Sequence, residues 1–467
     1  MPAAAPAPAV SQAASGPSPC RSAKSPKNTA TVPTTQDKDN EVMSKTLFTN
    51  VNILDSTGAQ PFFGEVLVVD ERITDVRRGT GNLPREGARV IDGRGQTLMS
   101  GLCDAHTHFT WNDGDLNSLE TMNVEEHLLH TVESAKYYID YGYTMCFGAA
   151  SAKKRLDVVV RDAINAGRIP GPRYLANGQE IATTAGDLVP GITQIADGVE
   201  EMRKVVRETI GLGVDQIKLS ISGEEITGTK AATDTYITEE ELQVAVDEAH
   251  RRHVRVCTHA RSRDSVLISL KTGVDMIYHA SYIDEEGMDL LEAAKDRVFV
   301  APAINWLVAT LKDAEAFGYS HEAAEQAGYA RELDIAVKAM QEMRRRGIRV
   351  LPGGDYGFAW TPRGTYARDL DHFVKLFGYT EMEAIIAATA LGGELFQKPN
   401  ELGKVLPGFY ADMILVDGNP LEDITILQDL TKITAVMKNG EFHREPAEHT
   451  PATPESADPA DVALTHL

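Results

Sequence analysis

Leu102-Cys103-Asp104-Ala105-His106-Thr107-His108 is the stretch that decides the fold, and the rest of the chain is arranged around it. Upstream, Thr97-Leu98-Met99 and Leu102 form an apolar run bounded by glycines, which predicts a short buried strand. Alternate side chains of a strand share a face, so His106 and His108 can bind one metal ion together. Because such pairs also occur as ordinary core or surface residues, the interpretation requires further ligands elsewhere in the chain.

The composition is that of a globular protein, with 42% apolar and 24% charged residues among 467. A formal net charge of −22 argues against nucleic acid as a partner, because backbone phosphates would be repelled. No apolar run approaches the ~18–20 residues of a membrane span, so we expect no membrane partner. The cysteines at positions 20, 103, 146 and 257 form no Cys-x-x-Cys pair, which indicates a reducing, cytoplasmic location.

The two ends of the chain differ in character from its middle. Residues 1–43 and 444–467 are rich in Pro, Ala and Thr, and we expect a disordered extension and a disordered tail. Short alternating strands with turn residues between them occupy 44–96 and 399–443. They predict the N-terminal and C-terminal parts of one small β-sandwich, built from both chain ends.

The middle of the chain, residues 97–398, alternates strand and helix. One helix begins at the capping-box pattern Thr238-Glu239-Glu240-Glu241. Counting the strand at 97–102, eight strands are expected, the others at 143–148, 173–176, 215–221, 254–259, 274–279, 298–302 and 348–352. The chain therefore predicts an α/β fold, a (β/α)8 TIM barrel with the β-sandwich attached.

Ionisable residues recur where these strands end. In such a barrel the functional groups lie at the C-terminal ends of the strands. Each residue alone has an ordinary structural explanation, but several at the same end of one barrel favour a shared site. The residues concerned are His106, His108, Lys218, His259, His279 and Asp355.

The order of these residues resembles the amidohydrolase superfamily. Its strand-one motif corresponds to residues 101–108, and its C-terminal return corresponds to 403–412 and Asn419-Pro420-Leu421-Glu422-Asp423. The resemblance extends from Lys45 to about Glu441. Within the superfamily the chain is most similar to the imidazolonepropionase- and prolidase-like branch, which includes enzymes that cleave ochratoxin, molinate and phenylurea herbicides.

The resemblance implies a binuclear centre with two divalent metal ions. His106, His108 and Asp355 would hold one ion, and His259 and His279 the other. Lys218, N-carboxylated by CO2, would bridge them, a state open to a buried lysine whose ammonium form is disfavoured beside cations. The alternative for Lys218 is an inward salt bridge to Asp355. Zinc suits imidazole and carboxylate ligands, although manganese or cobalt could substitute.

The resemblance also implies a function. We expect a metal-dependent hydrolase that cleaves a C–N bond of an amide, carbamate, urea or cyclic amide, prolidase-like dipeptides included, by metal-activated hydroxide. Asp355 would be the catalytic base and then the acid. The alternatives are a heterocycle deaminase of the same superfamily, disfavoured by Lys218, and a non-catalytic scaffold, disfavoured by the complete ligand set. A small-molecule substrate is expected, and relatives are often homo-oligomers.

Aromatic residues also gather after the strands. All three tryptophans, Trp111, Trp306 and Trp360, directly follow barrel strands, which predicts an aromatic-walled pocket for an apolar substrate. The alternative is that they cap the barrel rim. Tyr282 lies beside the same ends. Arg261, two residues past His259, could bind a substrate carboxylate or form a surface ion pair.

Three further features are given structural interpretations. His127 and His130 are one helical turn apart, a spacing open to metal binding, but we expect them on the outer ring of helices, away from the site. Cys257 shares the inward face of its strand with His259 and is expected to pack in the core. The charged segment 309–346 could be a lid, an oligomer contact or a solvated helical face.

Overall fold

Strands from both ends of the chain pair in one mixed sheet. The computed structural model describes residues 43–189 and 191–447, so the extension and tail expected from the sequence lie almost entirely outside the described residues. The sheet contains β1 (Lys45–Leu54), β2 (Phe62–Val69), β3 (Arg72–Arg78), β4 (Arg89–Asp92), β5 (Thr97–Ser100), β15 (Met413–Val416), β16 (Ile433–Lys438) and β17 (Glu441–Arg444). β5 joins the two halves, because it pairs in parallel with β1 and antiparallel with β15. The apolar core of this mixed sheet includes Phe48, Val66 and Met413.

The predicted boundary at residue 97 differs from the structure. β5 belongs to the mixed sheet, and the next strand, β6, begins at Leu102. Gly101 separates the two strands, and a Cβ there would lie 2.3 Å from side-chain atoms of Thr144. All residues of β5 and β6 are buried, so the sequence pattern predicts one continuous strand. It gives no signal for the point where the chain passes from the mixed sheet to a parallel one.

The remaining strands run parallel in two sheets. They are β6 (Leu102–Thr107), β7 (Tyr143–Gly148) and β8 (Arg173–Leu175) in one sheet, and β9 (Ile181–Ala182), β10 (Gln194–Ile195), β11 (Gln216–Ser220), β12 (Arg255–Ala260), β13 (Met276–His279) and β14 (Phe299–Ala301) in the other. A hydrogen bond links the two sheets: the side-chain Nε2 of Gln216 in β11 donates to the Leu175 carbonyl in β8 at 2.9 Å.

The last predicted strand, at 348–352, is much shorter than expected. It is reduced to a parallel bridge between Val350 and Val300. Two residues later, the backbone N–H of Ala105 in β6 donates to the Pro352 carbonyl at 3.0 Å. This segment therefore hydrogen-bonds to β14 on one side and to β6 on the other.

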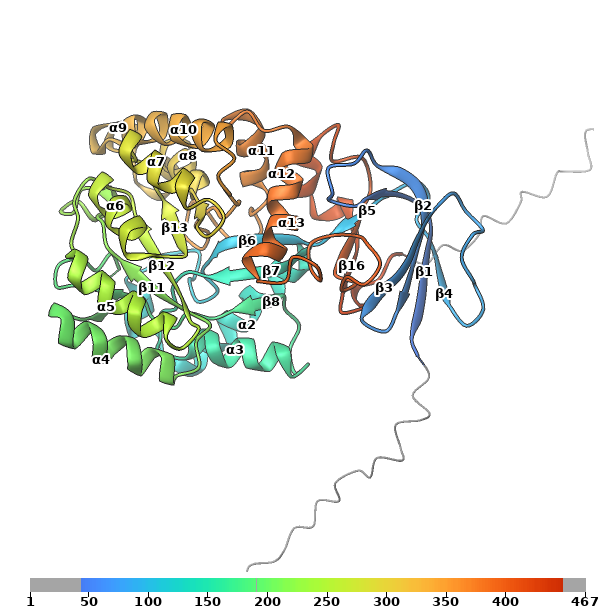
Figure 1. The fold of residues 1–467 in the computed structure, drawn as a ribbon, viewed down its shortest axis with the longest axis horizontal. Helices are drawn as coiled ribbons and strands as arrows, with labels where there is room; N and C mark the ends of the chain where they lie inside the picture. The colour runs from blue at the N-terminus through green and yellow to red at the C-terminus, as the bar shows by residue number, and fades with distance from the viewer. Residues whose placement is uncertain (1–42, 190, 448–467) are drawn as a thin grey trace, which may run out of the picture. The chain divides into compact units, whose positions relative to one another are not determined.

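Helices follow most of the parallel strands and flank them (Figure 1). The helices are α1 (Ser118–Thr121), α2 (Val124–Asp140), α3 (Leu156–Asn165), α4 (Gly198–Gly211), α5 (Glu239–His250), α6 (Arg263–Thr272), α7 (Glu285–Ala293), α8 (Ile304–Lys312), α9 (His321–Ala327), α10 (Tyr329–Arg345), α11 (Arg368–Lys375), α12 (Glu381–Ala388) and α13 (Ala390–Leu395). Short 3₁₀ turns are η2 (Glu225–Thr227), η3 (Ala314–Phe317), η4 (Ile424–Gln428) and η5 (Leu430–Lys432). The predicted capping box is confirmed: Glu241 N–H donates to the Thr238 hydroxyl, and Thr238 N–H donates to the Glu241 carboxylate.

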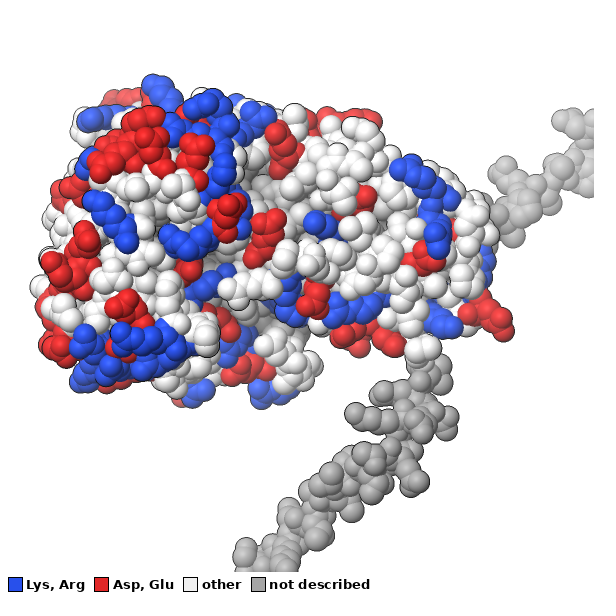
Figure 2. All heavy atoms as spheres, viewed as in Figure 1, with Lys and Arg blue, Asp and Glu red and all other residues white. Residues whose placement is uncertain are grey.

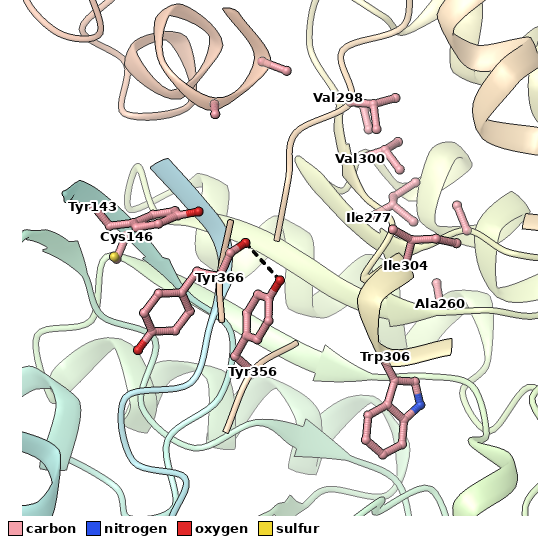
Figure 3. Packing of buried hydrophobic residues seen from close by; sticks show 14 of the residues in the cluster. Tyr143, Cys146, Ala260, Ile277, Val298, Val300, Ile304, Trp306, Tyr356 and Tyr366 are labelled. Atoms are coloured by element: carbon pink, nitrogen blue, oxygen red, sulfur yellow. Dashed lines mark hydrogen bonds between the residues drawn. The ribbon is translucent and has the colours of Figure 1, made fainter. Parts of the chain in front are cut away.

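The main core lies between the parallel strands and the helices. Figure 3 shows Val300 of β14 and Ile277 of β13 near Ile304 of α8, with Tyr356 and Tyr366 in the same core. The Tyr356 hydroxyl donates to the Tyr366 carbonyl at 2.9 Å. Because Tyr356 directly follows Asp355, this packing holds the backbone from which that carboxylate projects.

Charges of both signs are interspersed over the face of the molecule shown in Figure 2. Basic side chains gather there over α4 and α5, and several of them surround one buried carboxylate, that of Glu248. Its ion-pair partners are Arg203, Arg207, Arg251 and Arg252. None of the helices in the described ranges combines the length and apolar character needed to cross a bilayer.

A buried ion pair connects β8 to the mixed sheet. Arg173 Nε donates to Asp412 Oδ2 at 2.6 Å, and Asp412 Oδ1 accepts the backbone N–H of Asn439 at 2.8 Å. The Asp412 side chain is 3% exposed. Removing the carboxylate leaves a partly buried guanidinium without its counter-ion, which is costly.

We therefore expect Asp412→Ala to lower the free energy of unfolding by about 2 kcal/mol, measured by urea denaturation followed by circular dichroism. Asp417→Ala is the matched control, because Asp417 is 53% exposed and pairs with the exposed Lys432. Its effect should stay below about 1 kcal/mol. Equal losses in the two variants would contradict the structural role assigned to Asp412.

Candidate metal centre

Three of the predicted ligands meet in a buried cluster. Donor atoms of His106, His108 and Asp355 all lie within 4.8 Å of one another. Oδ1 of Asp355 is 2.9 Å from Nε2 of His108 and 3.8 Å from Nε2 of His106. The cluster joins the start of the parallel-strand region to its end, and it consists of the three residues that the resemblance assigns to one ion.

This cluster fits a cation. Although 2.9 Å apart, His108 Nε2 and Asp355 Oδ1 lack hydrogen-bond geometry, and neither has another hydrogen-bond partner among the described residues. Buried polar atoms are normally satisfied, so an unsatisfied nitrogen and an unsatisfied carboxylate oxygen facing each other indicate a missing partner. Imidazole and carboxylate are ligands that zinc accepts.

His259 and His279 form a second pair beside the cluster. Nε2 of His279 lies 2.9 Å from Nδ1 of His259, and the ring of His279 lies 5.3 Å from that of His106, centre to centre. His259 also contacts the Gly223 carbonyl at 3.2 Å through Nε2. The structure thus brings all four predicted histidines together.

Burial keeps the four imidazoles neutral. It lowers the pKa of His106, His259 and His279 well below the usual value, and that of His108 to a smaller extent. Positive charge on Lys218 contributes in the same direction, whereas Asp355 partly opposes the shift at His108. A neutral imidazole retains the lone pair that a metal ion requires.

Lys218 projects from β11 into the same cavity. Its side chain is 2% exposed, and Nζ lies 4.6 Å from the ring centre of Tyr278. Among the described residues, Asp355 forms its ion pairs with histidines, and none joins it to Lys218. The salt-bridge alternative for Lys218 is therefore wrong in this structure.

Two of the predicted ligands have left-handed backbones. His279 has φ of 72° and Asp355 has φ of 61°. Such conformations cost non-glycine residues roughly 1–3 kcal/mol each and persist where the surroundings impose them, most often at functional sites.

A cavity of about 880 Å³ opens above the cluster. Trp111, Trp306 and Trp360 all line it, as do His106, His108, Lys218, His259 and Asp355. The indole of Trp111 stacks on the His108 ring with centres 3.4 Å apart and planes 5° apart. Trp306 stacks on Trp360 at 5.4 Å, and Phe358 contacts both Trp111 and Trp306. The aromatic wall expected from the sequence is present.

Arg261 and Tyr282 do not line this cavity. Arg261 is fully buried, where its Nη1 donates to Glu332 at 2.7 Å and the guanidinium also pairs with Glu224. The surface-ion-pair alternative is therefore wrong, and two protein carboxylates occupy the place predicted for a substrate carboxylate. The backbone N–H of Tyr282 donates to the Arg261 carbonyl, and burial raises the pKa of the Tyr282 hydroxyl to about 12.

Three acidic residues near the site were not predicted. Glu224 lines the cavity, and burial together with the nearby Glu332 raises its pKa against the opposing effect of Arg261. Asp104 accepts the His106 N–H at 2.9 Å, and Asp369 accepts the Gly353 N–H at 2.8 Å. Burial raises the pKa of Asp104 to about 6 and of Asp369 to about 8. Asp104 lies in β6, within the stretch 102–108, and Glu224 follows the end of β11. Their positions in or after parallel strands are the signal that could have identified both residues.

The residues given structural interpretations behave as predicted in part. Nε2 of His127 contacts the Thr110 carbonyl at 2.6 Å, and Nε2 of His130 contacts the Trp111 carbonyl at 2.7 Å. Both lie on an outer helix, as predicted, but they bind the loop that follows β6 and carries Trp111, so they are not away from the site. Cys257 packs in the core, with its thiol donating to the Ile217 carbonyl at 3.3 Å.

The segment 309–346 is not simply a solvated helical face. It contains the end of α8, η3, α9, α10 and the residue that follows α10. Tyr329, Met340 and Met343 of α10 are buried in the main core, and Phe317 of η3 is 56% exposed and lines the cavity.

The chain is similar to known proteins in sequence and in fold. Residues 97–442 match the model of the amidohydrolase family. Ochratoxinase from Aspergillus niger is 28% identical over 419 residues, covering 83% of this chain and 84% of its own. Its crystal structure aligns with a TM-score of 0.76 at 26% identity, over 86% of this chain and 96% of that one.

Two other solved structures are similar. A prolidase complexed with N-methylphosphonate-L-proline aligns with a TM-score of 0.76 at 25% identity, covering 86% of this chain and 100% of that one. Molinate hydrolase aligns with a TM-score of 0.69 at 20% identity, over 86% of this chain and 94% of its own, and shares the fold. The resemblance predicted from residues 101–108 is confirmed.

If the cluster holds a metal ion, replacing its histidines should empty it. We expect the purified chain to contain a divalent metal by mass spectrometry, and His106→Asn and His108→Asn to reduce the content by at least about tenfold, because each loses an imidazole ligand. His321→Asn, at a 55%-exposed position on α9, is the control and should retain the metal. Retention of full metal content in both cluster variants would rule out this ligand set.

Proposed function

The chain belongs to the amidohydrolase family, and on that premise we propose that it hydrolyses a C–N bond in a small amide, carbamate, urea or cyclic amide. One observation carries the proposal: the unsatisfied His106–His108–Asp355 cluster lies at the wall of a cavity lined by all three tryptophans. A cavity of about 880 Å³ suits a small molecule. Relatives that cleave ochratoxin and proline-containing substrates support the reaction class.

The proposed site holds two divalent ions. His106, His108 and Asp355 would bind one, and His259 and His279 the other, with Lys218 shared between them. Bound ions would polarise the scissile carbonyl and lower the pKa of water so that hydroxide is available near neutral pH. Zinc suits these ligands, and manganese or cobalt could replace it.

Lys218 is proposed to be N-carboxylated. Its neutral amine adds to CO2 and releases one proton, which leaves an anionic carbamate with two oxygen donors. No carboxylate among the described residues forms an ion pair with its ammonium. Loss of charge on a buried lysine beside cations is physically favoured.

Asp355 is proposed to move the proton during catalysis. Its carboxylate accepts the proton of the attacking water and passes it to the leaving nitrogen, so it acts first as base and then as acid. The contact with His108 and the packing of Tyr356 fix its position. The tryptophan wall would hold the substrate and limit access of bulk water.

The surrounding architecture supports the same proposal. We infer that the two parallel sheets, linked through Gln216 and through Val350, form the predicted (β/α)8 barrel. We further infer that the mixed sheet forms the predicted β-sandwich beside it. The free, buried Cys103, Cys146 and Cys257 fit the cytoplasmic location that we propose. We also propose a homo-oligomer.

Asp355→Asn tests the proton-transfer role. With metal present, we expect turnover to fall by about 10²–10⁴-fold, because an amide cannot accept the proton. The measurement is hydrolysis of N-acyl amino acids, dipeptides with C-terminal proline, anilides, thiocarbamates and phenylureas by the metal-replete enzyme. Wild-type turnover in a variant that retains its metal would refute the role, and no cleavage of any compound by the wild-type enzyme would refute the hydrolase.

Lysine carboxylation has its own readout. We expect a carbamate carbon signal by NMR after incubation with ¹³C-bicarbonate, absent in Lys218→Ala, because only Lys218 is assigned this modification. Acetate should restore part of the activity lost in Lys218→Ala by supplying carboxylate oxygens. Lys230→Ala is the control, since Lys230 also lines the cavity but pairs with Asp187. An unchanged signal in Lys218→Ala would contradict the assignment.

A further inference from the structure

We propose that Glu180 binds a positively charged amine of the substrate, so that the substrate class is amides of amino acids and related compounds with an ammonium group near the scissile carbonyl. This inference rests on the proposed hydrolase function for its reaction. It adds a specificity-determining residue to the aromatic cavity.

Glu180 is a buried carboxylate at the cavity wall. It precedes β9, lines the cavity and is 5% exposed. Its Oε1 accepts one hydrogen bond, from the Thr193 hydroxyl at 3.0 Å. Among the described residues, no Lys, Arg or His forms an ion pair with it. Burying a carboxylate without a cation is unfavourable, so a ligand cation would stabilise it.

The other charged groups of the wall differ from Glu180 in having partners. Asp113 pairs with Arg363 at 2.6 Å, and Lys230 pairs with Asp187 at 3.0 Å. Glu224 pairs with Arg261. Asp115 is exposed to solvent. Among the described charged residues of this wall, leaving the proposed metal ligands aside, Glu180 is therefore the buried one that has no ion-pair partner.

The strand register places Glu180 near the proposed centre. β9 pairs in parallel with β11, with Ile181 opposite Leu219. The preceding residues, Glu180 and Lys218, are therefore neighbours across the two strands, and both line the cavity. A carboxylated Lys218 would add a second negative charge and strengthen attraction of a cation. An ammonium held here would lie close to the bond being cleaved.

Aromatic walls complement a cationic ligand. Trp111 and Trp306 line the same cavity, and indole faces attract ammonium groups. The Trp111 Nε1–H is buried and has no acceptor among the described residues, although the side chain is at the cavity. It could donate to an acceptor on the same ligand, which gives the substrate two points of attachment.

Calorimetric binding to the metal-replete chain tests the ammonium site without requiring catalysis. The probes are 3-phenylpropylamine, which is protonated at neutral pH, and its neutral analogue 3-phenylpropanol. We expect wild type to bind the amine at least about tenfold more tightly, and Glu180→Gln to lose about 10- to 100-fold in amine affinity while alcohol affinity stays within about threefold.

Two variants control for charge and for structure. Glu208→Gln removes an equal charge at a 54%-exposed site on α4 and should leave amine affinity unchanged. Thr193→Val removes the hydrogen bond to Glu180 but keeps the carboxylate, so amine preference should survive. Equal binding of the two probes to wild type, or equal weakening of both in Glu180→Gln, overturns the proposal. Loss of metal from Glu180→Gln also overturns it, because Glu180 would then act at the metal centre.

Hydrolysis distinguishes this proposal from the function on which it rests. With leucine 4-nitroanilide and its N-acetyl derivative, we expect wild type to prefer the free amine and Glu180→Gln to reduce the ratio of kcat/KM values at least about tenfold. Cleavage of both compounds with an unchanged ratio supports the hydrolase and refutes the ammonium site. If wild type cleaves neither compound and no compound of the wider panel, but still discriminates the amine from the alcohol in binding, the hydrolase is refuted and the ammonium site is supported.

Discussion

The close approach of the last parallel segment to the first parallel strand is the constraint on which the site depends. The Ala105 N–H donates a hydrogen bond to the Pro352 carbonyl, and a Cβ at Gly353 would lie 2.7 Å from the backbone nitrogen of His106. Only a glycine allows the two backbones to come this close. That approach places Asp355 against His108. Without this close approach, His106 of β6 and His108 after it would lack the Asp355 carboxylate beside them.

Much of the fold could be predicted from the sequence, because hydrophobic period and turn residues are local signals. The pattern could not show that β5 and β6 belong to different sheets, since both are buried throughout. Nor could it show that the segment at Val350 forms only a bridge. Both outcomes depend on neighbours distant in the sequence, which local patterns do not encode.

The site divides in the same way. The alternation within a strand correctly places His106, His108 and Lys218, because each lies in or directly after its strand. Arg261 also directly follows its strand, β12, so its position along the chain does not distinguish it from His108. It misses the cavity because buried carboxylates bind its guanidinium. Its partner Glu332 comes from α10, and no local pattern announces that contact.

The helix α2, on the outside of the parallel strands, contacts through two histidines the loop that carries Trp111 of the cavity wall. His130 of α2 contacts the Trp111 carbonyl, and His127 contacts the Thr110 carbonyl. These contacts fix the backbone of Trp111, whose indole stacks on the His108 ring, to α2. Tilting α2 by altered packing against α3 would shift the indole and change the width of the cavity. Directed evolution of substrate range could therefore vary the residues of α2 that pack against α3 and leave every cavity-lining residue unchanged.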